Sequence, residues 1–188
     1  MRDLDDWALV ARAQSGDSDA FALLVHRYHA PIIHFCFRMA GSRQDAEDVA
    51  QEVFLRLHRY LNRLNPQAKF STVLFGIARN LTLNYLRDMK RRGRGRSQPL
   101  DGMAELESHT GRPAHEARMR EIESHVEAAL KRLSPEHRMV IHLREVEGMD
   151  YDGIAEVLRC RKGTVKSRLA RAREQLRILL IEQGGELL

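Results

Sequence analysis

Apolar residues recur every three or four positions along almost all of this 188-residue chain, and none of the apolar runs alternates for long enough to indicate a β-strand. The spacing is clearest after Ser42, where a capping serine and an acidic first turn precede one continuous apolar stripe. Such a stripe marks the buried side of an α-helix. The chain is therefore predicted to be all-α. The residues of the stripe are Ala46, Val49, Ala50, Val53, Phe54, Leu57 and Leu61.

Capping residues and helix breakers divide the first 92 residues into further helices. We expect one helix from about Asp5 to Ser15 and a second that begins at the capping Asp17. Pro31 is expected to break or restart that second helix. A helix is also predicted from Ser71, with an inward side of Leu74, Ile77, Ala78, Leu81 and Tyr85 and an outward side of Arg79, Asn80, Asn84 and Arg87.

A stretch rich in glycine, proline and polar residues, 93–114, has no sustained period and reads as a flexible linker. It separates two predicted domains, 1–92 and 115–188. After it, Ser134-Pro135 is typical of a helix start and Gly148 of a helix end. The inward positions expected on either side of that start are Met119, Ile122, Val126, Ala129, Leu130, Leu133, Met139, Val140, Leu143 and Val146.

Residues 150–180 read as two helices joined by a tight, basic turn. Asp150 is a candidate N-cap of the first helix, and Gly163-Thr164 offers a start for the second. The second helix has an apolar stripe, and its opposite face combines small residues with cations, which suits close approach to phosphates and base edges. The pattern favours a DNA-binding helix-turn-helix over an ordinary charged surface helix. Residues on the outer face are Gly163, Thr164, Lys166, Ser167, Ala170 and Arg171.

Charge and cysteine content narrow the class of protein further. The net charge is +5 and the isoelectric point is near 9.5, which favours a polyanionic partner because the cations cluster. One cluster of cations runs from Arg87 to Arg96, at the end of the helix that is predicted from Ser71. The two cysteines lack metal-site spacing, and we see neither a signal sequence nor a membrane-spanning run. We expect a soluble, cytoplasmic protein.

Three ordered motifs carry a resemblance to a known family. They are DAEDVAQEVFLRLHRYL (45–61), FSTVLFGIARNLTLNYLRDMKRR (70–92) and LSPEHRMVIHLREVEGMDYDGIAEVLRCRKGTVKSRLARARE (133–174). The chain resembles the small extracytoplasmic-function (ECF) sigma factors of the bacterial sigma-70 superfamily. The first segment is similar to the one with which family members dock on RNA polymerase. The second is similar to the family's segment that melts DNA and reads the −10 element, and the third to the segment that reads the −35 element.

The resemblance implies a non-enzymatic factor that binds core RNA polymerase, at its β′ clamp and β flap, and directs it to promoter DNA. It also implies an anti-sigma partner, a monomer when free, and neither a cofactor, a metal nor a small-molecule substrate. The expected polymerase-binding residues are Asp45, Asp48, Gln51, Glu52 and Leu55. Those for the −10 element are Lys69, Phe70, Arg79, Asn80, Asn84, Arg87, Lys90 and Arg91. Those for the −35 element are Lys162, Thr164, Lys166, Ser167, Arg168, Arg171 and Arg173.

Within the −35 set, we expect Arg171, Lys166 and Ser167 to face bases, and Lys162, Arg168 and Arg173 to hold the DNA backbone. Two departures from the family pattern stand out. Val73 occupies a position where many members have tryptophan. The turn reads Arg159-Cys160-Arg161-Lys162, so either Arg159 adopts a positive φ or the turn has a different geometry.

Two other functions are compatible with parts of the sequence. A stand-alone helix-turn-helix regulator would use the same C-terminal half without polymerase. A metal-dependent hydrolase would need the histidines His26, His29 and His34 near Cys36, but Pro31 lies among them and no carboxylate stands at ligand spacing. The resemblance makes the sigma factor the leading interpretation.

Overall fold

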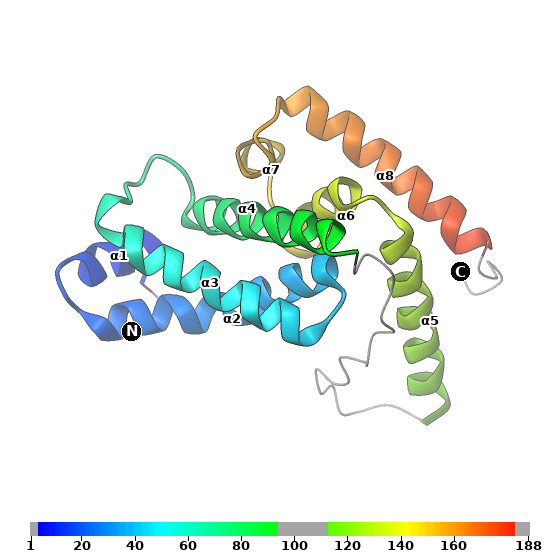
Figure 1. Cartoon of the computed structure of the whole chain (residues 1–188), viewed down its shortest axis with the longest axis horizontal. Helices are drawn as coiled ribbons and strands as arrows, with labels where there is room; N and C mark the ends of the chain where they lie inside the picture. Colours follow the sequence, from blue (N-terminus) through cyan, green and yellow to red (C-terminus); the bar gives the residue numbers. More distant parts are fainter. Residues whose placement is uncertain (1–3, 94–112, 183–188) are drawn as a thin grey trace.

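Every regular element in the described residues, 4–93 and 113–182, is helical in the computed structural model, as the sequence predicts. The helices lie in two groups, with α4 in the middle of the molecule (Figure 1). A short 3₁₀ turn (Leu61–Arg63) and a π-helical turn (His142–Val146) complete the chain path. The α-helices are α1 (Asp6–Gln14), α2 (Ser18–Ala40), α3 (Arg43–Tyr60), α4 (Phe70–Arg91), α5 (Pro113–Arg132), α6 (Pro135–Ile141), α7 (Tyr151–Leu158) and α8 (Lys162–Glu182).

Side-chain caps start several of these helices where the sequence predicts them. Asp17 accepts from the Ala20 amide at 3.0 Å at the start of α2, and Ser42 accepts from the Asp45 amide at 3.4 Å at the start of α3. Ser134 caps α6 in the same way, with Pro135 in its first turn. Each cap satisfies a backbone N–H that has no partner inside the helix.

The prediction that Pro31 breaks or restarts the second helix is wrong, because α2 continues through it. Proline lacks a backbone donor and costs about 3 kcal/mol in a helix interior. Leu24 on one side of it and Ile32 and Phe35 on the other are fully buried. Burying a large apolar side chain contributes about 1.5–3 kcal/mol, so packing on both sides of Pro31 outweighs its cost.

The segment between α3 and α4 is attached to the start of the chain. The Trp7 indole N–H donates to the Ala68 carbonyl at 2.9 Å, and its ring meets the edge of Phe70 at a centroid distance of 5.9 Å. The Gln14 amide donates to the carbonyls of Leu61 and Leu64 at 2.9 and 3.0 Å. These contacts fix the point at which α4 begins.

Helix α4 is buried on more than the one side that its sequence predicts. Leu74 and Ala78 are buried as expected, while the other expected inward residues, Ile77, Leu81 and Tyr85, are only half-buried. Three further residues, Thr72, Phe75 and Thr82, are buried. The reason is that α4 packs against α2 and α3 and also against α7, so no single stripe describes it.

The C-terminal group differs from its prediction at two apolar positions. Met119 on α5 is 43% exposed and Val146 is 58% exposed, although both are expected to face inward. Val146 turns outward because a π-helical turn replaces the last α-helical turn here, with the Glu147 amide donating to the His142 carbonyl. Gly148 then ends the segment at a φ of 63°.

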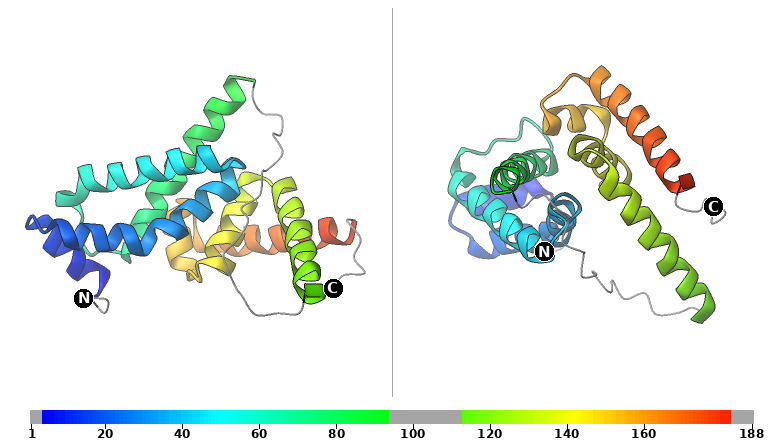
Figure 2. Two further views of the ribbon diagram at one scale, coloured as in Figure 1. Left: turned by 90° about the horizontal axis from the view of Figure 1, so that it is seen from below. Right: turned by 45° about the vertical axis from the view of Figure 1, so that its right-hand side comes forward.

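The two groups of helices pack directly on each other, a relation that the sequence leaves open. The Phe35 ring of α2 meets the His142 ring edge-on, 5.4 Å between centroids. Arg138 of α6 donates from Nη1 to the Arg38 carbonyl of α2 at 2.7 Å. Side views show α6 and α7 lying against α2 and α4 (Figure 2). The predicted linker, 93–114, falls almost wholly outside the described residues.

Among the described helices, none is both long enough and apolar enough to cross a membrane.

Candidate nucleic-acid interface

Helices α7 and α8 form the helix-turn-helix that the sequence predicts. Arg159 ends α7 in the left-handed region, at φ 52° and ψ 51°, which confirms the positive φ considered for this turn. The amides of Thr164 and Val165 donate to the Arg161 carbonyl at 2.8 and 3.1 Å, so α8 begins at Lys162. Buried side chains join the two helices and turn the opposite side of α8 outward: Ile154, Val157, Leu158, Val165, Leu169 and Ala172.

The outer face of α8 is open and largely built from small residues. Ser167, Ala170 and Arg171 are exposed, and Thr164 is half-buried. A Cβ placed on Gly163 would meet nothing within 4 Å. A surface of this shape lets a helix enter a groove closely, with long cations reaching the groove walls.

The cations of the −35 set divide into two groups by their contacts. The three expected to hold the DNA backbone each lie beside a carboxylate: Lys162 beside Asp152 at 2.7 Å, Arg168 beside Glu136 at 3.6 Å, and Arg173 beside Glu145. The two expected to face bases, Lys166 and Arg171, have no carboxylate partner among the described residues. Lys166 lies 5.9 Å above the Tyr151 ring.

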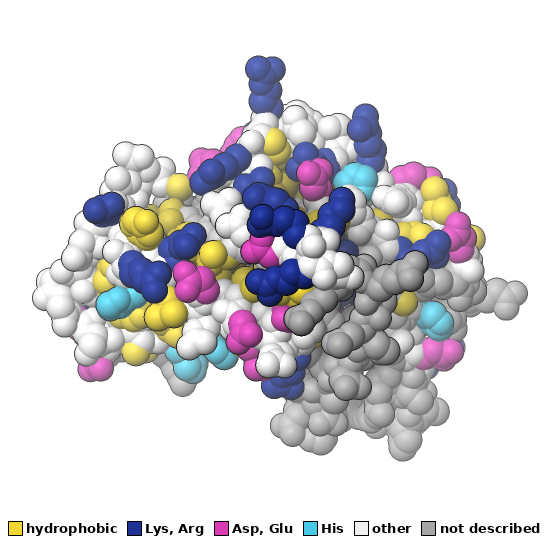
Figure 3. All heavy atoms as spheres, in the orientation of Figure 1, with side chains coloured by type: hydrophobic (Ala, Val, Ile, Leu, Met, Phe, Trp, Pro, Cys, Tyr) yellow, Lys and Arg dark blue, Asp and Glu magenta, His cyan; other side chains and the backbone are white. Residues whose placement is uncertain are grey.

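The −10 set of α4 is spread over buried, half-buried and exposed positions. Phe70 is buried at 2% exposure between Trp7 and Tyr28, so its ring supports the start of the helix and does not reach the surface. The C-terminal end of α4 is exposed or half-buried from Arg87 to Arg91. The predicted contacts Asn84, Arg87, Lys90 and Arg91 are all exposed. Figure 3 shows Lys and Arg side chains gathered over the middle of the molecule, where α4 runs.

Arg79 and Asn80 are half-buried on α4 and contact each other, with Arg79 Nη1 donating to Asn80 Oδ1 at 3.0 Å. Burial lowers the pKa of the Arg79 guanidinium, and the positive charges of Arg159 and Arg168 lower it further. Its buried Nε has no hydrogen-bond partner in the described part of the chain. Arg79 therefore lies where α4 meets the helix-turn-helix, near two cations and also near Glu136, the partner of Arg168.

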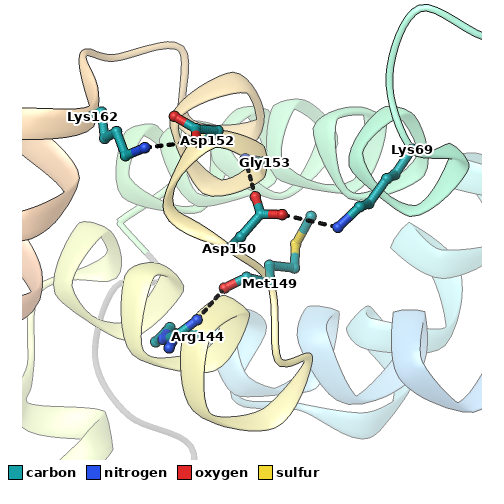
Figure 4. A network of polar contacts seen from close by, with 7 residues as sticks. All are labelled: Lys69, Arg144, Met149, Asp150, Asp152, Gly153 and Lys162. Atoms are coloured by element: carbon teal, nitrogen blue, oxygen red, sulfur yellow. Dashed lines mark hydrogen bonds and ion pairs between the residues drawn. The ribbon is translucent and has the colours of Figure 1, made fainter.

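The sequence does not indicate that Asp150, at the start of α7, contacts one of the residues expected at the −10 element. Asp150 accepts from the Gly153 amide at 2.8 Å, which caps α7, and from the Lys69 ammonium at 2.9 Å (Figure 4). The hydrogen bond to Lys69 lowers the pKa of the Asp150 carboxyl, and the same contact raises the pKa of Lys69.

The acidic face of α3 is present as a separate surface. Asp48 and Gln51 are exposed, and Leu55 beside them is 46% exposed. Glu52 is half-buried and lies 3.6 Å from both Arg56 and Arg59. An exposed leucine beside two carboxylates, those of Asp48 and Glu52, is suited to docking a partner that is both apolar and basic.

Asp45 lies apart from that surface. It is half-buried at the start of α3. Burial raises the pKa of Tyr85 on α4, and the nearby Asp45 carboxylate raises it further. Asp45 therefore faces α4 more than a partner.

The histidines considered for a metal site do not converge. His26 and His29 are exposed, His34 is half-buried and Cys36 is fully buried. In the described ranges, no group of three or more His, Cys, Asp or Glu side chains is placed to hold a metal ion.

Comparisons with known proteins agree with this arrangement. The family described as Sigma-70 region 2 matches residues 24–92, and the one described as Sigma-70, region 4 matches residues 125–176. The RNA polymerase sigma-H factor of Pseudomonas aeruginosa is 36% identical, with 91% of each chain covered. The ECF RNA polymerase sigma-E factor of Haemophilus influenzae is also 36% identical, with 92% of this chain and 94% of the relative covered.

A solved structure has the same fold at lower identity. It is that of the sigma factor RpoE in complex with the anti-sigma factor NepR from Bartonella quintana. The identity is 24%, the TM-score is 0.65, and the match covers 85% of this chain and 96% of that chain.

Proposed function

The chain belongs to the sigma-70 family, in its ECF class, and on that premise we propose that it binds core RNA polymerase through α3 and reads promoter DNA through α4 and α8. As a sigma factor it directs promoter-specific transcription initiation. The observation that carries the proposal is that the surface has two separate faces of opposite charge. An acidic face with an exposed leucine lies on α3, while the helix-turn-helix presents an open, cationic face. The chemistry belongs to polymerase, and the chain itself acts without catalysis.

We assign polymerase binding and the −10 element to residues 1–92, and the −35 element to residues 115–188, with 93–114 as the linker. The −35 element is duplex DNA, which suits the N-terminal half of α8 in the major groove. The −10 element is read as a melted strand, which suits the exposed Asn84 and Arg87 and the half-buried Arg79 and Asn80. The factor would act in the cytoplasm, where polymerase meets DNA.

An anti-sigma protein is a further proposed partner. Support comes from the protein of the same fold that is solved in complex with the anti-sigma factor NepR. Such a partner would have to cover α3, the DNA-facing helices, or both. The exposed leucine on α3 and the open cationic face of α8 are both accessible to such a partner.

Transcription in vitro with core polymerase tests the proposed function. A library of upstream DNA fragments should yield a discrete set of transcripts that need this chain, and core polymerase alone should yield none of them. A complete absence of such transcripts would overturn the proposal. Tight duplex binding by the chain without polymerase, combined with no transcript, would indicate a stand-alone regulator instead.

Replacing Arg171 with alanine should separate base reading from backbone contact. If Arg171 reads a base, Arg171→Ala should cost about 1–3 kcal/mol at a preferred −35 sequence and much less at a mismatched one. Arg173→Ala is the matched control, because Arg173 is expected to contact phosphate and should lose affinity evenly across sequences. Competitive binding of holoenzyme to paired promoters measures both. An even loss for Arg171→Ala would reassign it to the backbone.

A further inference from the structure

The loop between α3 and α4, residues 64–69, has an uncovered middle. Asn65 and Gln67 are exposed there, and Lys69, one of the proposed −10 contacts, is exposed at its end. The two amide side chains each carry donors and an acceptor, which suits the edges of unstacked bases. The internal hydrogen bonding of the loop is local, with the Gln67 amide donating to the Asn65 carbonyl at 2.9 Å. A local turn of this kind does not fix how the loop sits on the domain.

Helix α1 contacts the loop from outside, near both of its ends. The side-chain amide of Gln14 donates to the carbonyls of Leu61 and Leu64, at 2.9 and 3.0 Å. The indole N–H of Trp7 donates to the Ala68 carbonyl at 2.9 Å. All three acceptors are backbone atoms, so these bonds fix the path of the chain and leave the side chains in the middle of the loop free to bind.

Helix α1 is itself held by the core. Leu9 and Val10 are buried, and the Asp6 carboxylate accepts from the Tyr28 hydroxyl of α2. The Trp7 ring also lies edge-on to Phe70, the first residue of α4. The support that α1 gives to the loop is therefore rigid with respect to the start of α4.

We infer that Trp7 and Gln14 are positioning residues for the −10 element. They hold the loop in the shape in which Asn65 and Gln67 meet unstacked bases beside Lys69. A loop that is ordered before DNA arrives loses less conformational freedom on binding, so the contacts that it makes contribute more to affinity and selectivity. The inference rests on the proposed function, because it adds two base contacts and their support to the same −10 surface.

Replacing Gln14 with methionine tests the first support, since methionine has a similar length but no N–H donor. The probe is a single strand of about ten nucleotides from the −10 region of a promoter that holoenzyme transcribes, together with single-base changes of that strand. The preference of Gln14→Met holoenzyme for the unchanged strand should fall by at least about fivefold, the effect of two lost hydrogen bonds. Fluorescence anisotropy of labelled strands measures it.

The variant Trp7→Phe tests the second support. It keeps an aromatic ring beside Phe70 and removes the single N–H, so the same preference should fall by about two- to tenfold. Agreement between the two variants in the bases affected would assign both residues to one loop. Loss of preference at unrelated bases would overturn the inference.

The matched control is Arg12→Met, a change on the same helix. Arg12 pairs with Asp17 at 2.6 Å and makes no bond to the loop. Its preference among strands should stay within about twofold of the wild type, and so should the binding of all three holoenzymes to −35 duplex DNA. A merely structural role of Gln14 would weaken binding to every strand equally and leave the preference unchanged, which would overturn the inference.

Hydrogen exchange in the free chain separates this inference from the proposed function. The amides of Leu64 and Gln67 are both hydrogen-bonded, and in Gln14→Met they should exchange at least about fivefold faster, with no such change in Arg12→Met. Unchanged exchange would overturn the support by α1, even if transcription succeeds. Faster exchange without any transcript from the wild type would instead leave the support intact and overturn its role in base reading together with the proposed function.

Discussion

Replacing Phe35 with alanine is expected to lower the free energy of unfolding by about 3–5 kcal/mol, the usual cost of removing a buried phenylalanine. Phe35 is fully buried, and its ring lies edge-on to Phe75 at 5.5 Å and to His142 at 5.4 Å. Both groups of helices therefore line the cavity that the substitution leaves. A cavity shared by two packed surfaces collapses poorly, because relaxing one surface disturbs the other.

Urea unfolding followed by circular dichroism at 222 nm measures the loss as a lower midpoint. The matched control is Ile181→Ala on α8, where the side chain is 56% exposed and the change should stay within about 0.5 kcal/mol. Similar midpoints for the two variants would show that Phe35 is not part of the buried core in solution.

Reversing the charge at Asp48 and Glu52 is expected to weaken binding to core polymerase by about 100-fold. Like charges brought face to face across an interface cost several kcal/mol, and each 1.4 kcal/mol is a factor of ten. Asp48 is exposed, and Glu52 makes only long contacts of 3.6 Å with two arginines on its own helix. The fold should therefore tolerate Asp48→Lys/Glu52→Lys.

Titration of labelled core polymerase with each variant gives the affinities directly. Glu121→Lys/Glu123→Lys is the matched control, since it changes the net charge equally on two exposed positions of α5. The control should bind polymerase within about twofold of the wild type, the scatter expected of surface changes outside an interface. Equal losses for the two doubles would mean that net charge alone, and not the α3 face, governs the interaction.

Local signals in the sequence predicted the helix starts well. Asp17, Ser42, Ser134 and Asp150 all cap helices, because a cap depends on a few neighbouring residues and little else. The left-handed conformation of Arg159 is one of the two geometries that the sequence leaves open for the turn, since the turn has no glycine to adopt it. Helix caps and tight turns are determined by residues within about four positions of one another, so the sequence alone can indicate them.

Features that depend on distant packing were predicted less well. Pro31 lies inside a helix because side chains on both sides of it are buried against other elements, which local propensity does not register. Thr72 and Thr82 are buried because other helices cover α4 from several directions. A prediction from one apolar stripe assumes that only one side of the helix is buried. The partnership of Lys69 with Asp150 joins residues 81 positions apart, so no spacing in the sequence could indicate it.

The attachment of Trp7 has a consequence for spectroscopy. It is the only tryptophan in the sequence, so the indole emission of the unlabelled chain comes from a single place. That indole donates to the Ala68 carbonyl, one residue before Lys69. Indole fluorescence responds to the loss of a hydrogen bond and to the polarity around the ring. The intrinsic emission of the free protein therefore reports on the segment that introduces α4, and on any displacement of it by single-stranded DNA.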